Sequence, residues 1–219
     1  MLSEKTGRYR LLQWVSKIVV ALLISSNNAA VSHAAELTHV DVNSDGGVYR
    51  IRLEMKLDIA ADYVSEVLTD YRHIYRLNPS IVESRLLASP NEGTSRVYTR
   101  MEGCVLFYCT EFIRVEDVRE LDSGDLVAVI VPELSDFGSG AALWQITQQG
   151  ERSQLVYEAN FQPGFFVPPL VGSYFVKKKL KAEIMMAFQR VECNAKVRLW
   201  AKELGNDGVF GKKAKSMVC

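Results

Sequence analysis

The sequence predicts an α+β domain in which a curved antiparallel sheet of six to seven strands wraps around a long C-terminal helix. Three observations support this fold class. Residues 49–58 alternate strictly between apolar and charged side chains, several strand-length segments separated by turn residues follow, and a helical stretch runs from about residue 170 to residue 199. A helix of that length needs a broad surface on which to bury its apolar stripe, and the sheet provides one.

The N-terminal segment has the features of a cleavable signal peptide. Within residues 1–34 there are four basic residues and one acid, and the apolar run 18–24 is far shorter than the roughly 20 residues of a membrane span. The small residues Ser32 and Ala34 place cleavage before Ala35. We therefore expect export to the periplasm, with retention of residues 1–34 as an anchor as the alternative.

The expected mature chain is one domain without a cofactor. It comprises an N-terminal lead-in at 35–47, the main domain at 48–200 and a flexible tail at 201–219. Removing four basic residues and one acid from 26 of each leaves 22 basic and 25 acidic residues, a balance that disfavours nucleic acid as a partner. The chain has no C-x-x-C spacing and few histidines, so we predict neither a metal centre nor a cofactor.

The secondary-structure elements are expected in a simple order. After the strand at 49–58, Asp58 is a candidate N-cap for a short helix over 60–68, and a second short helical segment ends at Leu77-Asn78-Pro79. Turn residues then separate strands expected at 81–88, 95–104, 108–120, 126–132, 140–148 and 154–162. The apolar stripe of the last helix is formed by Leu180, Ile184, Ala187, Phe188, Val191 and Ala195.

This order of elements resembles the START-like helix-grip superfamily (SRPBCC), which includes polyketide cyclases, coenzyme Q-binding START domains and lipid transfer domains. The likeness covers roughly residues 48–198, and its last two segments are similar to an exported bacterial branch. It rests on LTDYR at 68–72, LNPSIVES at 77–84, PELSDF at 132–137 with Trp144, and FVPPLVG at 166–172.

The resemblance implies an elongated apolar cavity between sheet and helix. The function we predict is binding, carriage or sequestration of a lipid or polyprenyl quinone, without catalysis. A polyketide cyclase or dehydratase is one alternative, and an envelope interaction domain with a filled core is the other. The candidate ligand-binding residues are Leu53, Met55, Met101, Trp144, Tyr157, Phe161, Phe165, Phe166, Ile184 and Phe188, any of which could equally fill a core.

Charged residues suggest little enzymatic chemistry. The candidates for catalysis are Arg100, Arg114, Asp136 and Glu158, and we expect each to face solvent, because lone charges are seldom buried. The loop at 165–169 would lie at the cavity mouth, as a lid or a membrane-touching tip. Near it, a transient membrane-surface contact is predicted through Lys177, Lys178, Lys179 and Lys181, with a plain solvated helix face as the alternative.

All four cysteines lie in the exported part of the chain. If residues 106–107 formed a two-residue turn, Cys104 and Cys109 would face each other with Cα atoms about 4.5 Å apart, a distance that a disulfide can span. A turn at Glu102-Gly103 is the alternative and would leave both cysteines on one strand. We predict the disulfide, because an oxidising compartment permits it. Cys219 could pair with Cys193 or with another chain.

Overall fold

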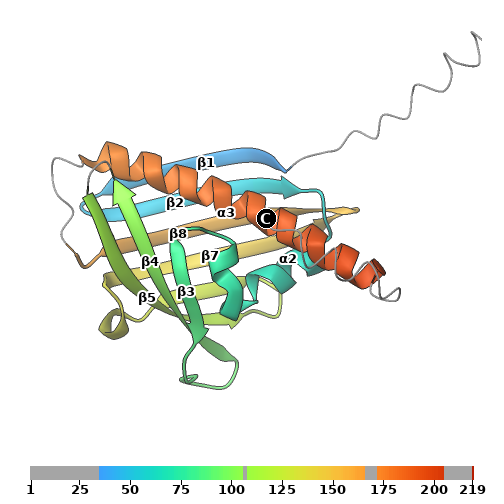
Figure 1. Cartoon of the computed structure of the whole chain (residues 1–219), viewed down its shortest axis with the longest axis horizontal. Coiled ribbons are helices and arrows are strands. Elements are labelled where there is room, and N and C mark those ends of the chain that lie inside the picture. Colours follow the sequence, from blue (N-terminus) through green and yellow to red (C-terminus); the bar gives the residue numbers. More distant parts are fainter. Residues whose placement is uncertain (1–34, 106–107, 166–171, 205–218) are drawn as a thin grey trace, which may run out of the picture. The chain divides into compact units, whose positions relative to one another are not determined.

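A long C-terminal helix crosses one face of an antiparallel sheet in the computed structural model of the chain (Figure 1). The structure describes residues 35–105, 108–165, 172–204 and 219. The eight strands are β1 (Glu36–Asp45), β2 (Val48–Leu57), β3 (Ile81–Leu86), β4 (Thr94–Val105), β5 (Tyr108–Glu120), β6 (Leu126–Ile130), β7 (Phe137–Gln149) and β8 (Arg152–Pro163). Their order in the sheet is β1-β2-β8-β7-β6-β5-β4-β3. The predicted α+β fold class and curved sheet are confirmed.

The sheet has one strand more than the six to seven predicted from the sequence. Strand β1, which lies in the segment expected to be a lead-in, pairs with β2 through a two-residue hairpin at Gly46 and Gly47, where φ is 55° and 83°. Both values suit glycine and the type I′ turn. The strand was missed because a register shift between Leu37 and His39 interrupts its apolar alternation.

The first helix begins without the predicted side-chain cap. Helix α2 (Ala61–Leu68) has Ala60 at its N-cap position, with no capping hydrogen bond from a side chain. The Asp58 carboxylate instead accepts a hydrogen bond of 3.1 Å from Arg152 Nε, so the expected N-cap role of Asp58 is wrong. The second short helical segment is the 3-10 helix η1 (Tyr71–Arg76), which ends just before Leu77 as predicted.

The last helix, α3 (Gly172–Leu204), is held against the core by its C-terminal half. Phe188, Val191 and Ala195 are all at most 1% exposed. Lys202 forms an ion pair of 2.5 Å with Glu66 of α2, and Arg198 pairs with Asp70 beside η1. The helix ends five residues later than predicted, and among the described residues no helix is long and apolar enough to cross a membrane.

Two disulfides connect the four cysteines. Cys104 and Cys109 are paired residues of β4 and β5 with Cα atoms 4.0 Å apart, which confirms the predicted bond. The alternative turn at Glu102-Gly103 is excluded because β4 continues through both residues. Cys193 of α3 bonds to Cys219, the pairing that the sequence left open.

The packing predicts a large stability loss when Leu53 is truncated. Leu53 is fully buried in the core beneath α3, so Leu53→Ala should lower the free energy of unfolding by about 2–5 kcal/mol in urea titration. Leu121 is 43% exposed, and Leu121→Ala, the matched control, should cost less than about 0.5 kcal/mol. Equal losses for the two variants would contradict this assignment of the core.

Removing either disulfide should lower the stability of the protein, and the two losses should differ in size. Cys193 and Cys219 lie 26 positions apart, so their replacement by serine should cost about 3.5 kcal/mol of unfolding free energy. Cys104 and Cys109 are only 5 positions apart, and the same change there should cost about 2 kcal/mol, because the shorter loop restricts the unfolded chain less. Peptide mapping without reductant checks the pairing, and free thiols at any of the four positions would refute it.

Candidate functional site

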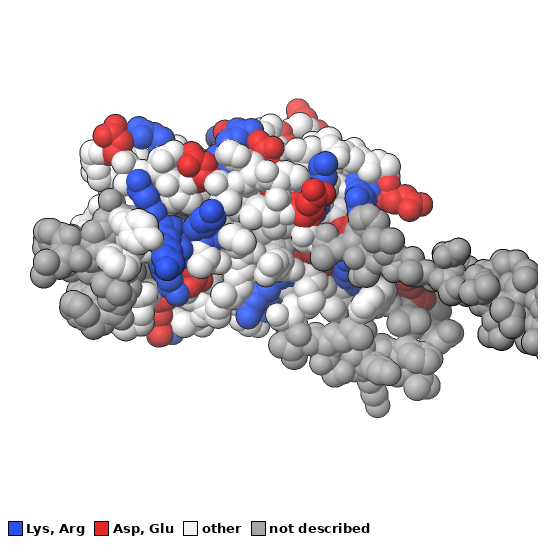
Figure 2. Space-filling view, turned by 90° about the horizontal axis from the view of Figure 1, so that it is seen from above, with Lys and Arg blue, Asp and Glu red and all other residues white. Residues whose placement is uncertain are grey.

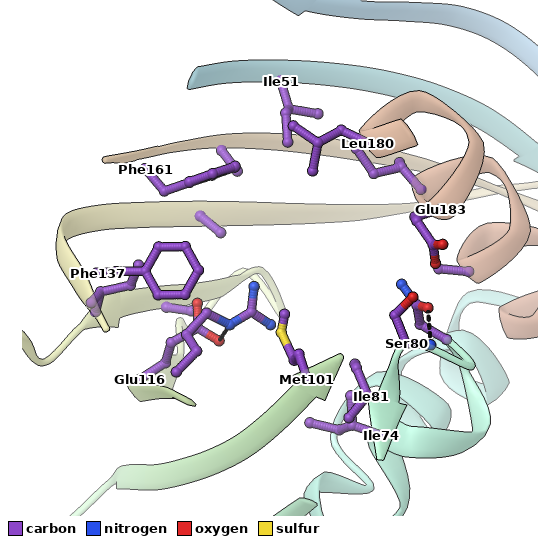
Figure 3. Close-up of a pocket in the computed structure, with 18 of the residues that line it drawn as sticks. Ile51, Ile74, Ser80, Ile81, Met101, Glu116, Phe137, Phe161, Leu180 and Glu183 are labelled. Carbon is purple, nitrogen blue, oxygen red and sulfur yellow. Dashed lines mark hydrogen bonds and ion pairs between the residues drawn. The ribbon is translucent and has the colours of Figure 1, made fainter. Parts of the chain in front are cut away.

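A largely apolar cavity of about 340 Å³ lies between the sheet and the N-terminal half of α3 (Figure 3). Residues of the seven strands β2 to β8 form its sheet side. Leu180, Ile184 and Ala187 of α3 close the cavity opposite the sheet. Its volume lies within the range of small-molecule pockets.

The inward face of the strands follows from their period of two. On β5 every second residue from Thr110 to Val118 lines the cavity, and on β2 Tyr49 and Ile51 do so. Successive side chains of a strand point to opposite faces of the sheet, so one run of alternate residues forms a continuous wall. Which residues line the cavity therefore depends on which alternate set of side chains in each strand faces inward.

Phenylalanines pack together at one side of the cavity. Phe165 stacks on Phe112 with ring centroids 5.5 Å apart and meets Phe137 edge to face at 5.7 Å. Phe137 in turn contacts Phe161 edge to face at 5.7 Å, and Phe161 stacks on Tyr49 at 5.4 Å. Offset and edge-to-face contacts are favourable for aromatic pairs, so this cluster forms a firm apolar wall.

A second aromatic group joins the cavity to the core. Trp144 lies 4.2 Å from Tyr157 and 5.6 Å from Phe188, measured between ring centroids. Tyr157 is enclosed by the protein, and this burial raises its pKa to about 12; Arg114 opposes that shift and Glu116 adds to it. Burial also raises the pKa of Tyr49 and Tyr71, so all three cavity phenols stay protonated at neutral pH.

Two ion pairs interrupt the apolar lining. On β5, Arg114 Nε lies 3.1 Å from a carboxylate oxygen of Glu116. On α3, Lys179 Nζ lies 2.5 Å from a carboxylate oxygen of Glu183. The labelled carboxylates of Glu116 and Glu183 stand on opposite sides of the cavity in Figure 3. The site thus combines long apolar walls with a few charged groups that come from different elements.

Most of the residues predicted to bind ligand do line the cavity. Those that the structure places there are Met101, Trp144, Tyr157, Phe161, Phe165, Ile184 and Phe188. Leu53 and Met55, by contrast, are at most 2% exposed and belong to the core under α3. Phe166 lies outside the described residues.

Of the four charged candidates for catalysis, three lie outside the cavity and one lines it. Glu158 pairs with Arg52, Arg100 pairs with Glu83 and Glu111, and Asp136 accepts a hydrogen bond from the backbone N–H of Ile113; none of the three candidates lines the cavity. Arg114 does line it, so its expected solvent-facing position is wrong.

Glu116 was missed by the sequence analysis, although a signal for it exists. Glu116 is separated from Phe112 and Val118 by even numbers of residues, so it lies on the same face of β5, and the side chains of that face line the cavity. Reading that alternation through the two charged positions would have placed Arg114 and Glu116 inside.

The four lysines predicted to contact a membrane surface have different environments. Lys179 lines the cavity and is paired with Glu183, Lys177 is half-buried, and Lys178 and Lys181 are exposed. The predicted lid at 165–169 is described only at Phe165, which packs into the phenylalanine cluster.

Structural comparison identifies the fold. A START superfamily protein from Mycobacterium smegmatis matches with a TM-score of 0.54 and 15% identity, over 67% of this chain and 97% of that one. An aromatase/cyclase from Streptomyces sp. R1128 matches with a TM-score of 0.55 and 17% identity, over 69% and 96%. A STAR-related lipid transfer protein from Xanthomonas axonopodis matches with a TM-score of 0.54 and 14% identity, over 72% and 98%.

The chain therefore has the START helix-grip fold, as the resemblance implied. No family model matches the sequence, and the search of curated proteins finds no match. At 14–17% identity the three structures share the architecture with this chain. Its activity has to be argued from its own cavity, because one fold hosts many functions.

Proposed function

We propose that this protein binds a hydrophobic molecule, such as a lipid or a polyprenyl quinone, and carries or sequesters it. The observation that supports this function is the apolar cavity between the sheet and α3. Ten buried methylenes of a ligand chain would gain about 8 kcal/mol, before the cost of association is subtracted. Apolar contact alone can therefore hold a chain there. The lipid transfer protein among the structural neighbours agrees with this function.

The proposed place of action is the periplasm. Two disulfides join the four cysteines, and structural disulfides persist in oxidising compartments outside the cytoplasm. Residues 1–34 supply a sequence with the pattern of an export signal. A carrier in this compartment would exchange its ligand at a membrane surface.

We further propose that the start of α3 touches that membrane surface. Tyr174 and Phe175 form an edge-to-face pair and are 68% and 39% exposed, a placement typical of aromatic residues at a lipid headgroup layer. Lys178 and Lys181 are exposed within two turns of this pair. In Figure 2 several Lys and Arg side chains gather near the end of the molecule where α3 begins.

The binding function predicts a co-purifying ligand. The protein purified from the cell envelope and weighed by native mass spectrometry should carry an apolar adduct that organic solvent extracts, because an empty apolar cavity exposes its walls to water. A mass equal to that of the bare chain would contradict the carrier function.

Filling the cavity should remove that adduct. Ala187 faces the cavity from α3, so Ala187→Trp is expected to lower adduct occupancy at least about tenfold, because the indole takes the volume of the ligand chain. Ala201 is an exposed residue of the same helix, and Ala201→Trp should leave occupancy unchanged. Unfolding curves of both variants show whether each remains folded. A folded Ala187→Trp variant with full occupancy would count against binding in this cavity.

Charge reversal at the start of α3 tests the membrane contact. Each lysine near an anionic surface contributes about 1 kcal/mol, so Lys178→Glu with Lys181→Glu should reduce retention on phosphatidylglycerol vesicles at least about tenfold. The control reverses the same number of charges at Arg50 and Lys56, which are exposed on β2. Equal retention of the two double variants would indicate that α3 forms only a solvated face.

A further inference from the structure

The charges that line the cavity are already neutralised by one another. Among the described lining residues there are two cations, Arg114 and Lys179, and three carboxylates, Glu102, Glu116 and Glu183. Both cations lie within ion-pair distance of a carboxylate on their own element. A ligand that enters this cavity therefore meets no surplus of positive charge on the part of the wall that the structure describes.

The two paired carboxylates are more deeply placed than their cations. The side chains of Glu116 and Glu183 are 15% and 12% exposed, whereas those of Arg114 and Lys179 are 27% and 42% exposed. Each carboxylate comes from a different element, β5 for Glu116 and α3 for Glu183. Negative charge consequently faces the cavity from two sides.

An anionic head would be poorly accommodated between these groups. An ion that leaves water loses its hydration, and only an available opposite charge with good geometry compensates for that loss. Recruiting Arg114 would leave the carboxylate of Glu116 buried without its partner, and recruiting Lys179 would do the same to Glu183. The two ion pairs therefore disfavour binding of a ligand whose head group is a carboxylate or a phosphate.

A neutral polar head meets suitable hydrogen-bonding groups in the same place. Glu183 Oε2, an acceptor, is buried and has no hydrogen-bond partner among the described residues. The hydroxyl groups of Tyr49, Tyr71 and Tyr157 add neutral donors to the lining residues. A hydroxyl, ester or quinone carbonyl could use these groups without bringing charge into the cavity.

We propose that the cavity selects apolar ligands whose polar end is uncharged, and that Glu116 and Glu183 determine this specificity by excluding anionic amphiphiles. This inference rests on the proposed binding function and specifies the class of ligand. Free fatty acids and phosphatidic acids would be rejected. Chains that end in an alcohol, an ester or a quinone would be accepted.

Two probes with the same tail and different heads provide the test. Delipidated full-length protein is incubated at neutral pH with palmitate or with 1-monopalmitoylglycerol, and occupancy is titrated by native mass spectrometry. The wild-type protein should bind the glyceride at least about tenfold more tightly than palmitate, a difference of about 1.4 kcal/mol. Equal affinity for the two probes would overturn the proposed specificity while leaving the binding function intact.

Removing one carboxylate should relax the specificity. In Glu116→Gln the shape of the side chain is kept and Arg114 becomes available, so the ratio of palmitate affinity to glyceride affinity should rise at least about tenfold. Glu183→Gln releases Lys179 on α3 and should raise the same ratio. It provides the test if Glu116→Gln does not fold.

A matched exchange outside the cavity controls for general charge effects. Glu158 of β8 is paired with Arg52 and does not line the cavity, so Glu158→Gln should leave the ratio unchanged. An unchanged ratio in folded Glu116→Gln and Glu183→Gln would refute the role of the carboxylates. Failure of the wild-type protein to bind either probe would instead count against the proposed function itself.

Discussion

Burial of one apolar stripe of α3 against the inward face of the sheet is the interaction on which this structure depends. Phe188, Val191 and Ala195 pack with Leu53 and Leu155 in one core cluster. A 33-residue helix cannot bury such a stripe by itself, and a single sheet cannot cover its own apolar face. The two surfaces therefore require each other, and the sheet curves around the helix.

The same helix also creates the cavity, because its two halves meet different surroundings. Toward the C-terminus, ion pairs from Lys202 to α2 and from Arg198 to Asp70 hold the helix over a filled core. Toward the N-terminus, Leu180 and Ile184 face open space that the sheet side chains do not fill. Close packing at one end thus stabilises a helix whose other end can cover a ligand.

The cavity also contains a few polar groups among its apolar walls. An apolar wall selects for tail length and shape but discriminates weakly between heads, whereas buried polar groups discriminate strongly when they are left unpaired. Arg114 and Glu116 place such groups on β5, and Glu183 places another on α3. The proposed specificity therefore rests on a few charges in a largely apolar cavity.

The sequence by itself determined the period-two strands and the apolar stripe of α3, because local spacing specifies them. For Cys104 and Cys109 it allowed two registers, and pairing between β4 and β5 decided for the disulfide. The sequence missed β1, whose alternation is broken by a bulge. Tertiary structure alone decided that Ile51 faces the cavity while Leu53, on the same face of β2, is core. Periodicity assigns a residue to a face of the sheet, but where along that face the helix makes contact depends on packing between distant elements.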